Sequence, residues 1–86
     1  MTDENFSILI AEDDSVTRML LKKTLTKEGH EVVSVENGQK AFELFKENFF
    51  PIVLTDWMMP EMDGLELCRA IRNEENPGYV FIVLLT

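Results

Sequence analysis

Two groups of carboxylates stand where apolar runs end, and they are the residues of this chain best suited to chemistry. Glu12-Asp13-Asp14 follows the run at residues 8–11, and Asp56 follows the run at residues 52–55. Both runs resemble buried strands of a parallel sheet, whose ligands gather beyond the carboxyl ends of the strands. The two groups are therefore expected to face one crevice. Clustered carboxylates raise each other's pKa or recruit a cation, and an all-oxygen site suits Mg²⁺, so the first hypothesis is magnesium-dependent phosphate chemistry.

Asp56 is the candidate nucleophile of this site. A carboxylate attacks phosphorus only when the negative phosphoryl oxygens are neutralised, and Mg²⁺ held by Asp13 and Asp56 would neutralise them. The competing interpretation of Glu12-Asp13-Asp14 is a group of acids that complements the dipole at the start of a helix. That arrangement is common, and it is the combination with Asp56 that favours the metal site.

Turn residues and apolar periodicity predict that strands and helices alternate along the chain. Strands are predicted at residues 6–11, 31–35, 51–55 and 80–85. Helices are predicted from residue 14 or 15 to about 28, after Asn37-Gly38, and from Gly64 to the turn at residues 76–78. In the first helix, one face is formed by Val16, Met19, Leu20 and Thr24. Right-handed crossovers in this order give an α/β fold, a doubly wound parallel sheet with helices on both faces.

Composition limits the classes of function. The chain has 86 residues, 45% of them hydrophobic, which is ordinary for one globular domain. No apolar stretch is long enough to cross a bilayer, and acids near the N-terminus argue against a signal peptide, so a cytoplasmic location is expected. The lone Cys68 agrees with this location and is interpreted as a small buried hydrophobe. A net charge of −8 disfavours binding to nucleic acid and to anionic membranes.

Four pieces of the chain resemble the receiver domain of two-component response regulators. They are ILIAEDD at residues 8–14, Asn37-Gly38, TDWMMPEMDG at residues 55–64 and VLLT at residues 83–86. The resemblance extends from about Phe6 to the last residue, and its most specific part is the D-x-x-M-P-x-M-D-G run that begins at Asp56. It implies the flavodoxin-like fold with strand order 2-1-3-4-5.

The resemblance also implies a role for each site residue. Asp56 is the phosphoacceptor, and the metal ligands are Glu12, Asp13, Asp56 and the backbone carbonyl of Met58, with Glu12 acting through water. Thr86 hydrogen-bonds a phosphoryl oxygen once the group has arrived, and this contact is the switch of the family. The implied cofactor is Mg²⁺, and the implied partner is a sensor histidine kinase or a phosphotransfer protein.

The sequence departs from the family at its end. A complete receiver has a fifth strand, two further helices and a lysine that pairs with the phosphoryl group, and every lysine of this chain precedes Asp56. We therefore expect residues 1–86 to be the N-terminal, incomplete portion of a receiver with strand order 2-1-3-4, followed by an output domain or acting on a target protein. The unpaired outer edge of residues 80–85 is expected to allow a dimer.

Two other function classes stay open beside a phosphorylation-controlled switch that assists only its own phosphorylation and dephosphorylation. A pseudo-receiver would bind partners without being phosphorylated; the missing lysine favours it, and intact Asp13, Asp56 and Thr86 oppose it. A phosphatase of the haloacid dehalogenase-like family would need a general acid two residues after its nucleophile, where this chain has Met58. Retention of phosphate on Asp56 separates these classes.

Overall fold

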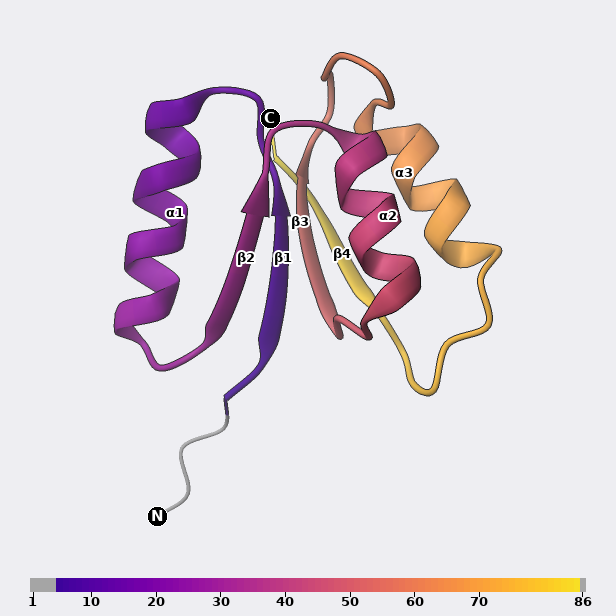
Figure 1. Cartoon of the computed structure of the whole chain (residues 1–86), viewed down its shortest axis with the longest axis horizontal. Helices are drawn as coiled ribbons and strands as arrows, with labels where there is room; N and C mark the ends of the chain where they lie inside the picture. Colours follow the sequence, from indigo (N-terminus) through magenta and orange to yellow (C-terminus); the bar gives the residue numbers. More distant parts are fainter. Residues whose placement is uncertain (1–4, 86) are drawn as a thin grey trace.

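The computed structural model describes residues 5–85, and it contains one parallel sheet with helices on both faces (Figure 1). The elements are β1 (Ser7–Ala11), α1 (Ser15–Lys27), β2 (Glu31–Val35), α2 (Gly38–Glu47), β3 (Ile52–Asp56), α3 (Gly64–Arg72) and β4 (Phe81–Leu85). The strand order across the sheet is β2-β1-β3-β4. The predicted doubly wound α/β fold with order 2-1-3-4 is confirmed, and the predicted element boundaries differ from the observed ones by a few residues at most.

The strand order reverses at β1, which pairs with β2 on one side and with β3 on the other. Crevices in open parallel sheets form at this kind of reversal, outside the carboxyl ends of the strands. The register aligns Ala11 with Thr55, the last pair of the β1–β3 ladder. Glu12 and Asp56, the residues that follow this pair, are therefore delivered to the same edge of the sheet.

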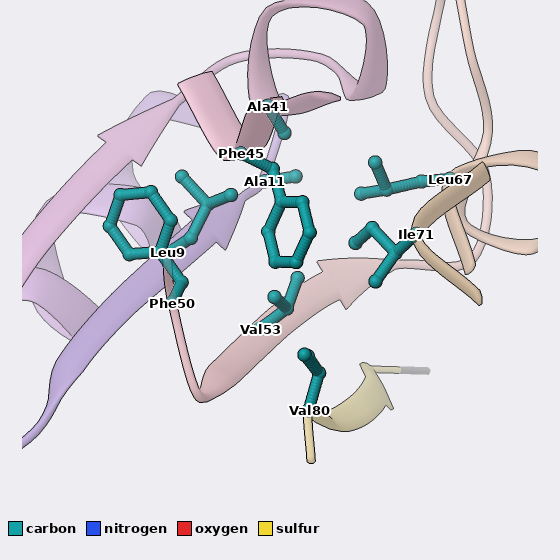
Figure 2. Close-up of a cluster of buried hydrophobic side chains, with 9 residues drawn as sticks. All are labelled: Leu9, Ala11, Ala41, Phe45, Phe50, Val53, Leu67, Ile71 and Val80. Carbon is teal, nitrogen blue, oxygen red and sulfur yellow. The ribbon is translucent and has the colours of Figure 1, made fainter. Parts of the chain in front are cut away.

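Helices α2 and α3 cover one face of the sheet and enclose the main core (Figures 1 and 2). The buried side chains of this cluster are Leu9, Ala11, Ala41, Phe45, Phe50, Val53, Leu67, Ile71 and Val80. They come from β1, β3, both helices and the segments that precede β3 and β4. β1 and β3 are the central strands of the sheet, and their apolar side chains on this face are closely packed. This packing holds both strands rigidly, and the site lies at their carboxyl ends.

The apolar face predicted for α1 lies in solvent. Val16, Met19 and Leu20 are 57%, 62% and 57% exposed. The half-buried side chains of α1 are instead Arg18, Leu21 and Leu25, which recur at helical spacing. No side chain of α1 is fully buried, because within the described residues α1 is the only helix on its face of the sheet (Figure 1).

Coverage of the α1 face decreases from β1 toward β4. Cross-strand partners share a face, so Ile8, Ile52 and Phe81 form one row opposite the main core. Ile8 is 3% exposed, whereas Phe81 at the end of the row is 62% exposed. In the part of the chain that the structure describes, the outer edge of β4 also has no strand partner. Within residues 5–85, the sheet is thus covered by helices on its α2–α3 side and exposed over β4 on the other.

Side-chain caps fix where the helices begin. Asp14 caps α1 by accepting a hydrogen bond from the Thr17 backbone N–H at 2.8 Å, and Asn37 caps α2 by accepting one from the Lys40 N–H at 2.8 Å. Asp63 begins α3 with a capping box. All three caps lie in loops at the carboxyl edge of the sheet. No helix within residues 5–85 combines the length and hydrophobicity that a membrane span requires.

Candidate functional site: an acidic cluster at the carboxyl edge of the sheet

Three of the predicted site residues come together at this edge. Glu12, Asp13 and Asp56 each offer one carboxylate oxygen, and these oxygens lie within 4.8 Å of one another. Glu12 is buried, Asp56 is half-buried and Asp13 is exposed, so the cluster is open to solvent on one side. Glu12 and Asp13 come from the β1–α1 loop, and Asp56 ends β3. The grouping expected from the two apolar runs is therefore present.

Hydrogen bonds hold the β1–α1 loop in a defined shape. The Glu12 N–H donates to the Val35 carbonyl of β2 at 3.0 Å, and the Glu12 carboxylate accepts the Asp14 N–H at 3.0 Å. Arg18 of α1 donates from Nη1 to the Glu12 carbonyl at 2.7 Å. Because β2, the loop itself and α1 all contribute a contact, the loop cannot turn without breaking several bonds at once.

Asp14 is not part of the acidic cluster, and its side chain caps helix α1. Its carboxylate accepts both the backbone N–H of Thr17, at 2.8 Å, and the Thr17 hydroxyl, at 2.6 Å. The bond from the hydroxyl is the main cause of a lowered pKa for Asp14. The helix interpretation is confirmed for Asp14, which caps α1. Glu12 and Asp13 lie beside Asp56, and their role as metal ligands stays a prediction.

The loop after Asp56 is held by close backbone approaches at two glycines. A Cβ on Gly64 would lie 2.1 Å from the Asp56 carbonyl oxygen, and a Cβ on Gly38 would lie 2.1 Å from the Met62 carbonyl oxygen. The Gly64 N–H also donates to the Trp57 carbonyl at 3.0 Å. Only glycine allows these approaches, so the starts of α2 and α3 together fix the loop that follows Asp56.

The electrostatics of the cluster single out Asp56. Partial removal from water raises the pKa of Asp56 to about 7, and hydrogen bonds shared with the side chains of Glu12 and Asp13 add to the rise. The Asp13 backbone N–H interacts with the same carboxyl group and offsets part of it. A carboxylate whose charge is opposed by its neighbours in this way is stabilised by a bound cation.

The donor set fits Mg²⁺. Three carboxylate oxygens from Glu12, Asp13 and Asp56 supply hard, anionic ligands, and the open side of the cluster leaves room for the waters that Mg²⁺ retains. No histidine or cysteine belongs to this group, which disfavours softer metals.

The structure shows less of the other two predicted site residues, Met58 and Thr86. Met58 lies two residues after Asp56, and its side chain is 78% exposed. Together with Asp56, Trp57 and Leu85 it lines an open, mainly apolar pocket. The carbonyl contact expected of Met58 stays a prediction, and Thr86 lies outside the described residues.

Sequence reasoning missed two neighbours of the site. Leu85 lines the pocket beside Asp56, and the bond from Arg18 to the Glu12 carbonyl crosses a strand–helix junction. The position of Leu85 could have been predicted from strand register, because Leu85 pairs with Asp56. The Arg18 bond could not have been predicted from periodicity, since it depends on where α1 lies relative to the loop.

The fold and the acidic cluster define a flavodoxin-like domain with a candidate metal site at its strand-order reversal. A family model described as the response regulator receiver domain matches residues 8–86. The chain belongs to this family, whose members are signalling domains of two-component systems rather than classical enzymes.

A curated relative, the response regulator receiver protein CpdR of Brucella abortus, is 50% identical over 62 residues. The match covers 72% of this chain and 52% of the relative, so the chain spans about half of that protein's length.

Two solved structures are similar in fold. The receiver domain of the sensor histidine kinase PA1611 from Pseudomonas aeruginosa has a TM-score of 0.89 at 30% identity, with 96% of this chain and 68% of that chain covered. It holds a magnesium ion in its active site cleft. The receiver domain of Ssk1, crystallised with the phosphotransfer protein Ypd1 of Saccharomyces cerevisiae, has a TM-score of 0.89 at 25% identity, covering 100% and 66%. The receiver domain of Ssk1 thus forms a complex with a histidine phosphotransfer protein.

The raised pKa of Asp56 predicts a pH-dependent gain in stability for Asp56→Asn in metal-free protein. Unfolded Asp56 ionises near its ordinary pKa of 3.8 and folded Asp56 near 7, so ionisation favours unfolding as the pH rises between these values. Asparagine carries no such cost. The midpoint of thermal unfolding, followed by circular dichroism in EDTA, is expected to rise for Asp56→Asn at pH 8 and to change little at pH 4.

The matched control is Asp14→Asn, because the pKa of Asp14 is lowered and its ionisation favours the folded state. This variant is expected to gain nothing at pH 8. Equal midpoint shifts for Asp56→Asn at pH 4 and pH 8 would contradict the prediction.

Proposed function

We propose that Asp56 accepts a phosphoryl group in a Mg²⁺-dependent reaction and that the phosphorylated form shifts a two-state equilibrium. The observation that carries this proposal is the convergence of Glu12, Asp13 and Asp56 within 4.8 Å at the strand-order reversal of a receiver-family fold. The domain assists its own phosphorylation and dephosphorylation and transforms no other substrate.

In the proposed step a carboxylate oxygen of Asp56 attacks phosphorus. The bond from phosphorus to a phosphohistidine nitrogen, or to the acetate oxygen of acetyl phosphate, breaks, and its electron pair leaves with the imidazole or the acetate. Asp13, Asp56 and the Met58 carbonyl would hold Mg²⁺. The ion supplies charge neutralisation on the phosphoryl oxygens when bound.

Glu12 is assigned a contact through water. Its carboxylate is buried and already accepts the Asp14 N–H at 3.0 Å, which limits its freedom to move onto an ion. Asp13 is exposed and offers a carboxylate oxygen beside Asp56, so a direct contact is assigned to it.

Thr86 is assigned the contact with a phosphoryl oxygen. Support comes from register, because Leu85 pairs with Asp56 across the β3–β4 ladder and Thr86 is the next residue. This contact would couple phosphorylation to the carboxyl end of β4, and it is the proposed origin of the switch.

The proposed phosphodonor is a sensor histidine kinase or a phosphotransfer protein, and the signal passes to an output domain or a target protein. The receiver family of the chain and the Ypd1–Ssk1 receiver complex support this assignment. We assign no nucleic acid or membrane contact to this segment, given its net charge of −8, and place it in the cytoplasm.

Mg²⁺ is expected to give a saturable change in the fluorescence of Trp57, which is 48% exposed and follows Asp56 directly. Asp13→Asn should weaken the apparent affinity by at least about tenfold, because even indirect partners of a metal site contribute that much. Titration with MgCl₂ at constant ionic strength measures it, with Glu47→Gln as a control acid at the end of α2. An unchanged affinity in Asp13→Asn would refute the metal assignment.

Acetyl phosphate with Mg²⁺ is expected to add one phosphoryl group, and Asp56→Asn or EDTA should abolish the addition. Glu12→Gln should slow the reaction less than Asp13→Asn, since its contact with the ion is assigned through water. Intact mass spectrometry follows the modification. Label that survives in Asp56→Asn would move the acceptor elsewhere, and a chain that binds Mg²⁺ without gaining a phosphoryl group would be a pseudo-receiver.

We also propose that this chain forms dimers through the outer edge of β4. Phe81, Val83 and their neighbours form an uncharged strand, and Phe81 and Val83 are 62% and 46% exposed. An edge of this kind presents unpaired N–H and C=O groups and no charge or proline that would stop another strand from pairing.

Val83→Lys is expected to convert the dimer to monomer, because a charge at an exposed strand position opposes edge-to-edge pairing. Leu20→Lys is the control: it places the same charge on α1 at a side chain of similar exposure, 57%. Sedimentation equilibrium measures the oligomeric state of the wild-type chain and of both variants. A monomeric wild-type chain, or equal dissociation by both variants, would count against pairing through β4.

A further inference from the structure

Arg18 connects helix α1 to the acidic loop. It is one of the half-buried side chains of α1, and its Nη1 donates to the Glu12 carbonyl oxygen at 2.7 Å. This oxygen lies at the end of β1, beyond the last residue that pairs with β2. A short bond from a charged donor in a partly buried position is among the stronger protein hydrogen bonds.

The atom that Arg18 binds belongs to the same peptide group as the Asp13 N–H. A peptide group is planar, and its C=O and N–H point in opposite directions. This peptide joins Glu12 and Asp13, and each of these residues offers a carboxylate oxygen within 4.8 Å of a carboxylate oxygen of Asp56. Fixing the direction of the Glu12 carbonyl therefore fixes the plane of the peptide from which the Glu12 and Asp13 side chains reach Asp56.

Nearby charges hold Arg18 where it is. The acids that act on its charge are Asp14 in the loop and Glu36 after β2, and Glu36 is itself paired with Lys40 of α2. Arg18, Glu36 and Lys40 line one small pocket with Ser34 and Val35. The guanidinium thus lies between the loop, the end of β2 and the start of α2, where few other positions would satisfy it.

We propose that Arg18 is a positioning residue for the acidic site: it orients the Glu12–Asp13 peptide so that the carboxylates of Glu12 and Asp13 converge beside Asp56. The consequence for metal binding rests on the proposed function. The orientation of the peptide does not, and it is testable in metal-free protein.

A purely structural role for Arg18 has a matched control within the chain. Arg72 of α3 donates from Nη1 to the Val80 carbonyl at 2.8 Å, also in a partly buried position, where the chain enters β4. The two bonds are alike in chemistry and length, but the Arg72 bond lies at the amino end of β4, away from the acidic cluster. Arg72→Ala therefore reports the loss of such a bond without the proposed effect on the site.

The experiment compares wild type, Arg18→Ala, Arg18→Lys and Arg72→Ala. The Asp13 amide resonance is recorded by ¹H–¹⁵N NMR in EDTA, the Mg²⁺ affinity by Trp57 fluorescence, and stability by thermal unfolding. We expect Arg18→Ala to move the Asp13 amide resonance and to weaken Mg²⁺ binding about tenfold, as loss of an indirect partner of a metal site does. Arg18→Lys keeps the charge and a donor and should recover part of both effects, while Arg72→Ala should lower stability and leave both unchanged.

An Asp13 amide resonance that moves no more in Arg18→Ala than in Arg72→Ala would overturn the proposal, whatever the metal does. If Arg18→Ala does not fold, Arg18→Lys decides in the same way against Arg72→Lys. A wild-type chain that fails to bind Mg²⁺ would refute the proposed function, and a moved Asp13 resonance in Arg18→Ala would still support the positioning role.

Discussion

Three carboxylates gathered within 4.8 Å repel one another, and the rest of the structure holds them together against that repulsion. Two unit charges about 4 Å apart cost about 1 kcal/mol in water and about 4 kcal/mol near a protein surface. A small domain has a total free energy of unfolding of only about 5 to 15 kcal/mol, so repulsion of this size is a large fraction of it. The pKa of Asp56 is raised to about 7 mainly by partial removal from water, with smaller contributions from hydrogen bonds to Glu12 and Asp13 and from the charge of Glu12. A bound cation would stabilise the ionised form of this carboxyl group.

The restraint on the cluster comes from backbone contacts more than from the acids themselves. Gly38 and Gly64 let α2 and α3 approach the loop after β3 closely, and the Arg18 bond fixes the loop after β1. Behind both loops lies the core formed by β1, β3, α2 and α3 (Figure 2). The site is therefore built from loops on a rigid support, the arrangement that allows charged groups to be held at unfavourable distances.

The two faces of the sheet differ in what they offer. The face under α2 and α3 is closed and holds the site in place, whereas the face under α1 becomes exposed toward β4, where Phe81 is 62% exposed (Figure 1). The exposed apolar side chains of α1 and β4 are Val16, Met19, Leu20, Phe81 and Val83. Within the described residues, apolar burial is therefore greatest around β1 and β3 and least toward β4, and local stability follows apolar burial.

The sequence alone determined the order of the elements, the parallel sheet and the convergence of Glu12, Asp13 and Asp56, because apolar runs that end in acids specify both strands and their carboxyl ends. Only the tertiary structure decided which face of α1 packs and what Arg18 contacts. Helical periodicity predicted the face with Val16, Met19 and Leu20, whereas Leu21 and Leu25 are half-buried, because the packed face depends on which neighbour lies beside the helix. The Arg18 bond likewise depends on where α1 crosses the end of β1, a placement set by packing across residues distant in the chain.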